Sequence, residues 1–502
     1  MMRSDSQLPA QTDVVVVGSG NAALCAAIAA ADSGADVVVL EKAPRDWAGG
    51  NSFFTAGGFR VAHAGLPDLL QLLNPATLPD LEIILAPYTR DDYVADVLRV
   101  TEHRADRALL DRLVDDSHDT LAWLHDVGLE FRLMIERQAF RIANTLRFWG
   151  DLAIGTVDGG KGLVRGLTSL AEARNVAFAF DSPMTDLDLD HSRRICGVRF
   201  RLNGGAEKVI KSRAVVLACG GFESDPALRA QFLGAPWDLA KVRGTPFNTG
   251  DGHRIAINRG AAPAGHWSGC HAVAWDAGAP DYGSREHTNT YTRGSYPAGI
   301  VVNERAERFV DEGADFRVYT YAKYGAAILF QPGSHAFQLF DAQAAPYLRT
   351  DEYTSIATQM HAETVDDLAR QIGVDASALR RTIATFNRAV EPGEFDLTQL
   401  DGKSARGVVP AKSNWAQTLD KPPFSAYPVT CGITFTFGGL RINDDAAVLD
   451  RCGRIIEGLF AAGELSGGLF YHNYPGGAGL MAGAVFGRRA GLNAAGGAVR
   501  GS

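Results

Sequence analysis

The sequence predicts an α/β fold with a Rossmann-like domain, and three observations near its start carry this prediction. The β-branched run Val14–Val17 is typical of a short buried strand. The glycine-rich segment Gly18–Ala23 follows it and opens an alanine-rich helix that extends to about Ser33, with Gly34 as its stop signal. A second apolar strand, residues 36–40, then ends at an acidic residue. Strand, glycine turn, helix and strand in this order predict a βαβ unit of a parallel sheet.

Each part of the glycine-rich segment Gly18-Ser19-Gly20-Asn21-Ala22-Ala23 has a physical role. Gly18 permits a tight turn, Gly20 lets the backbone approach a pyrophosphate, and the small Ala23 lets helix and strand pack closely. The free N–H groups and positive dipole at the helix start, at Asn21 and Ala22, attract phosphates. Glu41 lies 23 residues after Gly18, where an acid can accept ribose hydroxyls. Together these features predict one half-site for a dinucleotide.

Glycine-rich segments elsewhere in the chain indicate FAD rather than NAD. Gly49–Ser52 supplies backbone donors beside a phosphate, and the strand at 215–218 leads into the pair Gly220-Gly221. Near the C-terminus, Gly458–Glu464 places an acid after a strand, and Pro475–Gly479 opens a helix. A second acid and a second helix start suit a long cofactor. The predicted FAD contacts are Gly18, Gly20, Asn21, Ala22, Glu41, Lys42, Gly49, Gly50, Asn51, Ser52, Gly57, Gly58, Ala218, Gly220, Asp251, Gly463, Glu464, Gly477, Ala478, Gly479 and Leu480.

Composition argues against several other classes of protein. The 502 residues carry a formal net charge of -9 and no basic run, so we expect no nucleic-acid partner. The longest early apolar stretch, Ala22–Ala31, is too short to span a membrane, and Met1–Thr12 lacks the pattern of a secretory signal. The six cysteines show no CxxC spacing, which argues against zinc, iron–sulfur and disulfide frameworks. We therefore expect a cytoplasmic protein without a metal site or a membrane anchor of its own.

The chain resembles the fumarate reductase/succinate dehydrogenase flavoprotein superfamily, and within it tricarballylate dehydrogenases most of all. The likeness to the superfamily rests on Gly18–Ala23, Glu41, Gly49–Gly58, Thr249–Gly252 and Gly458–Arg488. The likeness to tricarballylate dehydrogenases rests on Gly20–Ala27, Gly49–Ser52, Arg308–Phe316 and Gly432–Thr436. The resemblance implies an FAD domain interrupted by an inserted α+β cap domain. The expected division is 13–270 for the first part of the FAD domain, 271–430 for the cap and 431–495 for the return segment. A helical pattern at 365–390 suits a pair of cap helices.

The same resemblance suggests catalytic residues. Arg317 follows the Arg308–Phe316 motif, where fumarate reductases carry a proton-transferring arginine, and holding a substrate carboxylate is a second role for it. His271 lies within one position of a histidine that contacts substrate in those enzymes. Tyr319 and Tyr321 are phenols of the same segment that could relay protons, and Tyr319 is the one predicted to be catalytic.

Departures from the family pattern change the expected cofactor attachment and substrate. Phe53 and Phe54 follow Ser52, where succinate dehydrogenases carry the histidine that bonds FAD covalently, so non-covalent FAD is predicted. Phe435 replaces a histidine, and Tyr474 replaces a substrate-binding arginine. Tyr474-Pro475-Gly476 is similar to an element of 3-ketosteroid dehydrogenases, in which the tyrosine hydroxyl polarises a ketone.

Three functions stay open from the sequence. The first is an FAD-dependent oxidoreductase acting on a CH–CH bond, or reversibly on a C=C bond, beside a carboxylate or ketone, with a tricarballylate-like polycarboxylate as substrate. The second is a 3-ketosteroid dehydrogenase-like desaturase or enone reductase. The third is a flavoprotein subunit that passes electrons to a separate acceptor protein. Cap arginines gathered at the flavin (Arg285, Arg293, Arg317) would favour the first, and an apolar cavity would favour the second.

Overall fold

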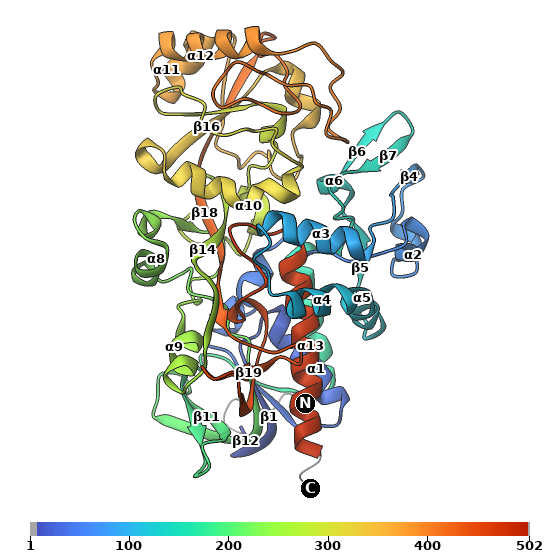
Figure 1. The fold of residues 1–502 in the computed structure, drawn as a ribbon, viewed down its shortest axis with the longest axis vertical. Helices are drawn as coiled ribbons and strands as arrows, with labels where there is room; N and C mark the ends of the chain where they lie inside the picture. The colour runs from blue at the N-terminus through green and yellow to red at the C-terminus, as the bar shows by residue number, and fades with distance from the viewer. Residues whose placement is uncertain (1–7, 500–502) are drawn as a thin grey trace.

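The computed structural model describes residues 8–499, so the first part of the polar segment Met1–Thr12 lies outside the described residues. The chain forms a lower body built on one large sheet and an upper body capped by two helices (Figure 1). Two long strands, β14 (Pro263–Asp276) and β18 (Phe424–Leu440), connect these bodies and pair antiparallel with each other. The mixed α/β architecture confirms the predicted fold class.

An eight-stranded mixed sheet forms the centre of the lower body. Its first strand β1 pairs in parallel with β2 on one side and with β12 on the other, as the βαβ prediction requires. The strand β12 is long enough to pair with β11 along its first half and with β20 along its end. The strands of this sheet are β1 (Gln11–Val17), β2 (Val37–Leu40), β9 (Ala177–Ala179), β10 (Met184–Leu189), β11 (Ile195–Arg201), β12 (Glu207–Leu217), β19 (Ala447–Leu449) and β20 (Ile455–Ala461).

The N-terminal half-site folds as the sequence predicts. Helix α1 (Asn21–Asp32) begins directly after the glycine turn, and Gly34 follows its end with a φ of 85°. The core of the sheet is the run of valines in β1, which are almost fully buried. Helix α13 (Ala478–Val499) packs along α1, so segments from the two ends of the chain lie side by side.

Close packing of α1 against α13 depends on small residues. A Cβ added to Gly487 would lie 2.3 Å from the backbone oxygen of Ala22, and one added to Gly491 would lie 2.2 Å from that of Ala26. Both helices begin at glycine-rich turns, Gly18–Gly20 and Gly476–Gly477. Their N-termini therefore meet at the same edge of the sheet, which is where the cavity described below opens.

The upper body is a second, six-stranded sheet with helices on it. Its central strand β18 pairs with β14, β16, β17 and β13. Helices α11 and α12 confirm the predicted helix pair within 365–390. The further elements are β13 (Lys241–Val242), β15 (Ile300–Asn303), β16 (His335–Phe340), β17 (Met360–Ala362), α10 (Arg317–Leu329), α11 (Val365–Ile372) and α12 (Ala376–Ala389).

Smaller helices and sheets flank the lower body on both sides (Figure 1). The helices are α2 (Leu66–Leu70), α3 (Arg90–Val100), α4 (Arg107–Asp115), α5 (Ser117–Asp126), α6 (Ile135–Gln138), α7 (Gly159–Ala173), α8 (Pro226–Leu233) and α9 (Asp251–Asn258). Of these, α8 and α9 lie on the left of Figure 1, and α2, α3, α4 and α5 lie on the right. The strands are β3 (Gly58–Phe59), β4 (Glu82–Ile84), β5 (Phe131–Leu133), β6 (Ala139–Ile142), β7 (Thr145–Phe148) and β8 (Ile154–Thr156).

The predicted division of the chain at 270/271 and 430/431 stays a prediction. Both positions fall inside paired strands, the first in β14 and the second in β18. The two bodies are therefore joined by a continuous ribbon of hydrogen-bonded backbone. Helix α10 lies at the level where they meet (Figure 1), and its first turn lines the cavity there.

Candidate active site

A deep cavity runs from the N-termini of α1 and α13 to the first turn of α10. Glycine-rich turns form one end, and aromatic and cationic side chains form the other. The empty space, counted out to the open mouth, is about 2010 Å³. The lining extends without a break from the glycine-rich turns of the dinucleotide half-site to Arg317 and Tyr321 of α10, so one cavity reaches both ends of the site.

The glycine turn at the start of α1 is shaped for close approach by a ligand. Gly18 has a φ of 106°, and a Cβ there would lie 2.3 Å from the carbonyl oxygen of Ala218. The N-cap residue Gly20 has no side chain to cap α1, and the first helical N–H, that of Asn21, donates to Ser52 Oγ at 3.0 Å. The N–H groups that follow it and the helix dipole are therefore available to a phosphate.

Glu41 lies buried at the end of β2, as the ribose-binding prediction requires. Its carboxylate accepts hydrogen bonds from the Ser19 hydroxyl and, at 2.7 Å, from the backbone N–H of Ala43. Burial raises the pKa of Glu41 above its ordinary value, while these hydrogen bonds lower it. Next to it, Lys42 forms an ion pair with Asp251 at 2.7 Å, which ties β2 to the start of α9.

Most of the residues predicted to contact FAD line this one cavity. The structure brings together Gly18, Gly20, Asn21, Ala22, Glu41, Lys42, Gly50, Asn51, Ser52, Gly58, Ala218, Gly220, Asp251, Gly463, Glu464, Gly477, Gly479 and Leu480. Gly49, Gly57 and Ala478 are not part of the lining, although each is next in sequence to a residue that is. Because segments from both ends of the chain bring two glycine-rich helix starts and a buried acid to one cavity, the residues present fit FAD.

Two buried carboxylates, Glu223 and Glu464, lie within hydrogen-bonding distance of each other. Glu464 accepts at 2.7 Å from the backbone N–H of Thr436, and Glu223 accepts from the side-chain amides of Asn51 and Asn248. Burial raises the pKa of both, and the Glu223 charge raises that of Glu464 further. Two carboxylates this close oppose each other's ionisation, which favours a proton on the pair.

At the other end of the cavity, His271 is fully enclosed by aromatic rings. Its ring centroid lies 4.9 Å from that of Tyr321, 4.8 Å from that of Tyr474 and 5.3 Å from that of Phe435. Neither ring nitrogen has a hydrogen-bond partner among the described residues. Burial, and then the charge of Arg243, hold the pKa of His271 well below 6.5, so the imidazole is neutral and offers one donor and one acceptor.

The hydroxyls of Tyr321 and Tyr474 are hydrogen-bonded to each other beside this histidine. Burial, followed by the nearby Tyr321, raises the pKa of Tyr474 well above 10. Tyr474 therefore stays a neutral hydrogen-bond donor throughout the physiological range. Phe435, Phe437 and Phe470 pack around it and make this part of the wall apolar.

Tyr319, predicted as a catalytic residue, does not line the cavity. Residues two apart on a helix point to different faces, whereas residues four apart share one, so Arg317 and Tyr321 of α10 face the cavity and Tyr319 does not. Its hydroxyl donates to Asp96 at 2.6 Å and lies 3.1 Å from a nitrogen of the buried Arg60. This correction leaves Tyr321, named beside Tyr319 in the sequence, as the phenol that α10 places in the cavity.

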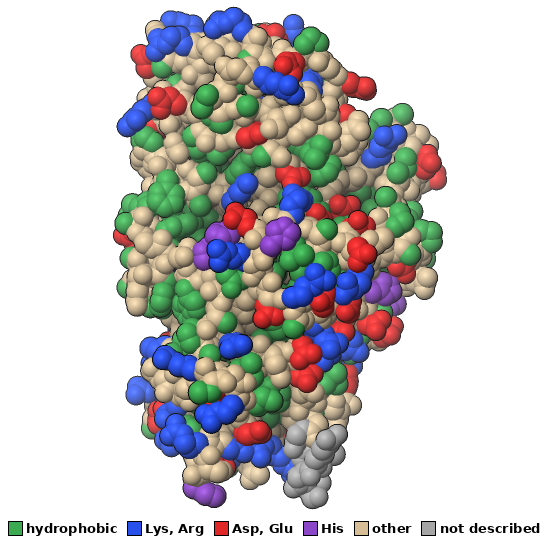
Figure 2. All heavy atoms as spheres, in the orientation of Figure 1, with side chains coloured by type: hydrophobic (Ala, Val, Ile, Leu, Met, Phe, Trp, Pro, Cys, Tyr) green, Lys and Arg blue, Asp and Glu red, His purple; other side chains and the backbone are tan. Residues whose placement is uncertain are grey.

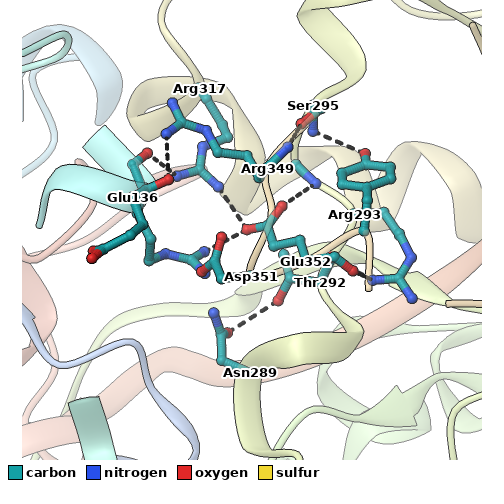
Figure 3. A network of polar contacts seen from close by, with 12 residues as sticks. Glu136, Asn289, Thr292, Arg293, Ser295, Arg317, Arg349, Asp351 and Glu352 are labelled. Atoms are coloured by element: carbon teal, nitrogen blue, oxygen red, sulfur yellow. Dashed lines mark hydrogen bonds and ion pairs between the residues drawn. The ribbon is translucent and has the colours of Figure 1, made fainter. Parts of the chain in front are cut away.

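Arg317 lines the cavity but is held in a buried ion-pair network (Figure 3). Its Nη1 donates to Glu352 at 2.8 Å, and its Nη2 donates to the backbone oxygen of Arg137 at 3.2 Å. Arg137 also pairs with Glu352 and with Asp351. Burial alone would raise the pKa of Glu352, but Arg137 and Arg317 hold it at about 2. Arg317 is thus neutralised by a permanent counter-ion.

The two other cap arginines named from the sequence lie outside the cavity lining. Arg293 is completely buried and pairs with Asp276 at 2.6 Å. Arg285 donates to the backbone oxygen of Ala48 and packs on the ring of Phe53, with 3.3 Å between its guanidinium carbon and the ring centroid. The gathering of cap arginines that would favour a polycarboxylate is therefore not formed by these residues.

Sequence reasoning missed Arg243, which lines the cavity beside His271. Its guanidinium donates to Asn289 Oδ1, at 2.9 Å from Nε, and to Thr434 Oγ1 at 3.1 Å. No carboxylate lies within ion-pair distance of it among residues 8–499. No motif surrounds Arg243 or Asn289 in the sequence, so the only signal was an arginine close before the Thr249–Gly252 element.

Two further observations concern the described part of the chain alone. Within residues 8–499, no group of three or more His, Cys, Asp or Glu side chains is arranged to hold a metal ion. None of the described helices combines the length and the apolar character that crossing a membrane requires. Acidic and basic side chains are interspersed over the face shown in Figure 2.

Comparison with known proteins places this geometry among FAD enzymes. The family model described as FAD binding domain matches residues 13–480. The chain is 28% identical over 494 residues to the probable fumarate reductase Ifc3 of Shewanella frigidimarina (strain NCIMB 400), which covers 96% of this chain and 75% of the relative. It is also 28% identical over 528 residues to 4-oxocyclohexanecarboxylate 2-dehydrogenase of Sinomonas cyclohexanicum, covering 92% and 89%.

Solved structures give the same picture of the fold. The open conformation of a flavocytochrome c3 fumarate reductase superposes with a TM-score of 0.71 at 25% identity, covering 97% of this chain and 79% of that one. The 3-ketosteroid delta1-dehydrogenase from Sterolibacterium denitrificans also gives a TM-score of 0.71, at 22% identity, with 97% of this chain and 100% of that chain covered. The second likeness concerns the fold alone.

Proposed function

Because the chain belongs to the FAD binding domain family, whose model matches residues 13–480, we propose that it oxidises the CH–CH bond next to a ketone carbonyl, or reduces the corresponding enone. That it is an FAD-dependent oxidoreductase of CH–CH or C=C bonds follows from its relatives and from its place in the fumarate reductase/succinate dehydrogenase superfamily. The ketone is our inference from the cavity. The observation that carries it is the hydrogen-bonded pair Tyr321–Tyr474 beside the neutral His271.

The chemistry divides between the cofactor and the chain. Bound FAD accepts a hydride equivalent in dehydrogenation and supplies one in reduction. The chain must polarise the carbonyl and move one proton at the neighbouring carbon. With its pKa well above 10, Tyr474 is suited to donate a hydrogen bond to the carbonyl oxygen, which acidifies the adjacent C–H. Tyr321 is the neighbouring phenol through which that proton leaves or arrives.

The cavity supports a ketone better than a tricarballylate-like polycarboxylate. Several carboxylates would need several free cations, yet three of the four cationic side chains that line the cavity already pair with acids: Lys42, Arg137 and Arg317. Arg243 alone among them lacks such a partner. Each missing charge-assisted contact would forfeit roughly 1.5–3 kcal/mol of binding.

The relatives bear on the choice of ketone. The Sinomonas relative is named for a cyclic ketone that also carries a carboxylate, and such a compound suits a cavity that offers phenols, an apolar aromatic wall and one unpaired cation. A neutral steroid would leave that cation without a partner. The third prediction was a subunit that passes electrons to a partner protein. Such a subunit would not need unused hydrogen-bond donors at this end of the cavity, so we rank it below the ketone-specific enzyme. A separate electron acceptor, non-covalent FAD and catalytic roles for Arg317, His271 and Tyr474 are part of this proposal.

The test is an anaerobic stopped-flow measurement of flavin bleaching in the purified holoenzyme. Three compounds are offered in parallel: 4-oxocyclohexanecarboxylate, a 3-ketosteroid and tricarballylate. Bleaching by the cyclic oxo acid, and none by tricarballylate, is expected. Bleaching by tricarballylate alone would overturn the assignment of a ketone. If oxidised flavin is not bleached by any of them, the reduced enzyme is mixed with the matching enones, and failure there as well would also reject it.

A further inference from the structure

The donor groups at the aromatic end of the cavity outnumber their acceptors. A guanidinium carries five N–H donors, and Arg243 spends three of them, two on Asn289 Oδ1 and one on Thr434 Oγ1. The remaining two have no acceptor among the described residues. Arg243 is 7% exposed, so bulk solvent supplies few acceptors for these two N–H groups.

Asn289 adds a second unused donor at the same place. Its Oδ1 accepts from Arg243 and, at 3.0 Å, from the hydroxyl of Thr292. These donors fix the orientation of the amide, so its nitrogen points away from Thr292 (Figure 3). That Nδ2 is buried without an acceptor, although Asn289 lines the cavity. His271, also without partners, offers one more ring N–H.

The charges nearby leave the same end electropositive. The network around Glu352 contains three guanidinium groups, those of Arg137, Arg317 and Arg349, but only two carboxylates, those of Asp351 and Glu352. Arg243 adds another positive charge without an anion. A buried cation and buried donors left unpaired both cost free energy, and one carboxylate would satisfy all of them.

We infer that Arg243, Asn289 and His271 form a subsite for a single carboxylate of the substrate, so that the enzyme acts on an oxo acid rather than on a neutral ketone. This inference rests on the proposed function, because it places the carboxylate in the same cavity as the carbonyl held by Tyr474. The guanidinium of Arg243 and the amide of Asn289 both keep unused N–H donors, which are the groups that carboxylate oxygens accept. The aromatic wall of Phe435 and Phe470 packs on the apolar body between the two groups.

The first test measures binding without turnover. Cyclohexanecarboxylate, which has no ketone, is titrated into the holoenzyme while the flavin absorbance band is followed, and cyclohexanol serves as the uncharged probe. Wild-type protein is expected to bind the carboxylate, and R243Q to bind it about 10- to 100-fold more weakly, the loss of one charge-assisted contact. R243K, which keeps the charge, is expected to recover part of the affinity. The matched control R285Q removes an arginine outside the cavity lining and is expected to leave the affinity unchanged.

The second test separates the subsite from the ketone chemistry. The kcat/KM for 4-oxocyclohexanecarboxylate is divided by the kcat/KM for its uncharged methyl ester. This ratio is expected to fall about 10- to 100-fold in R243Q, mainly because KM for the acid rises. If ketones bleach the flavin but R243Q does not weaken carboxylate binding, the subsite is overturned and the proposed function stands. If carboxylate binding depends on Arg243 but no ketone bleaches the flavin, the proposed function is overturned and the subsite stands. A changed flavin reduction potential in R243Q with unchanged carboxylate affinity would assign Arg243 to the cofactor and reject the subsite.

Discussion

The hydroxyl of Tyr321 is hydrogen-bonded to the hydroxyl of Tyr474, although 153 positions separate these residues in the chain. Tyr321 comes from the first turns of α10, and Tyr474 precedes the glycine turn at the start of α13. The pair therefore joins the helix at the meeting of the two bodies to the segment that completes the cofactor end of the cavity. A shift of α10 relative to that segment would break the pair, so the phenols are aligned only when the cavity is assembled.

Removing either phenol oxygen tests the roles proposed for the pair. Tyr474→Phe is expected to lower the rate of flavin reduction by the oxo acid about 10²- to 10³-fold, because the carbonyl loses its hydrogen-bond donor. Tyr321→Phe is expected to lower it about 10²- to 10⁴-fold and to reduce the solvent isotope effect, because the proton must then take another route. Stopped-flow bleaching at saturating substrate measures both.

Tyr282→Phe is the control, since Tyr282 is 37% exposed and lies outside the cavity lining. Bleaching rates within about threefold of wild type in both cavity variants would contradict the assignment of the carbonyl to this pair.

Glu352 is expected to be essential for stability rather than for turnover alone. Glu352→Gln leaves Arg317 buried without its counter-ion and Arg137 with Asp351 alone, and breaking such a buried pair typically costs about 3–5 kcal/mol. The pKa of Glu352 in the folded state, about 2, lies below its ordinary value of 4.5. Its contribution is therefore complete above pH 4.5 and is lost as the pH falls toward 2. Denaturant unfolding at neutral pH, and again at pH 4, measures both effects.

Asp351→Asn is the matched control for this prediction, because Asp351 pairs with Arg137 alone and its side chain is 32% exposed. A smaller loss than that of Glu352→Gln is expected. Equal losses would mean that the net charge of the network, rather than the buried contacts of Glu352, sets its contribution.

The glycine half-site was predictable because its information is local. Gly18, Gly20 and Glu41 follow one another within a single βαβ unit, and each residue type is dictated by the backbone or by the ligand at its own position. The return segment at 458–480 was predictable for the same reason. The close packing of Gly487 and Gly491 of α13 against α1 was not predicted, because it depends on which helix lies opposite these glycines.

The aromatic end of the cavity was predictable only in part. Arg317 and His271 were found through a family resemblance, but the counter-ion of Arg317 comes from Glu352, in a segment without a motif. Tyr319 was preferred over Tyr321 because the start of α10 was not predicted, and without the helix the two phenols look equivalent. Arg243 and Asn289 meet only through tertiary structure, since 46 residues separate them.

The buried pair Glu223–Glu464 predicts a loss of stability at alkaline pH. Glu464 keeps its proton in the folded state at a pH where an unfolded chain would release it, because its pKa is raised well above 4.5. Such a group stabilises the fold below pH 4.5, and this contribution is lost as the pH rises through the folded-state pKa. In Glu223→Gln the pKa of Glu464 is expected to fall, at about 1.4 kcal/mol for each unit.

Thermal unfolding of the holoenzyme across about pH 5 to 9 measures this effect. A shallower decline of the midpoint is expected in Glu223→Gln than in wild type. Glu82→Gln removes an exposed carboxylate of β4 and serves as the control. Parallel declines in all three proteins would show that the pair does not share a proton.

Cofactor retention gives the most direct test of the half-site. Two glycines with similar backbone conformations, Gly18 and Gly34, differ in the space available for a Cβ. Gly18 and Gly34 both adopt a left-handed backbone, with φ of 106° and 85°, so alanine costs each about 1 kcal/mol of strain. A Cβ at Gly18 would lie 2.3 Å from the Ala218 oxygen, whereas one at Gly34 would meet nothing within 4 Å. Gly18→Ala must therefore displace the turn that approaches the pyrophosphate, and Gly34→Ala need not.

The purified G18A protein is expected to lose most of its FAD and G34A to keep it, measured as the ratio of flavin to protein absorbance. Full retention by G18A would mean that the phosphates do not lie against this turn, and equal loss by G34A would assign the effect to general destabilisation of α1.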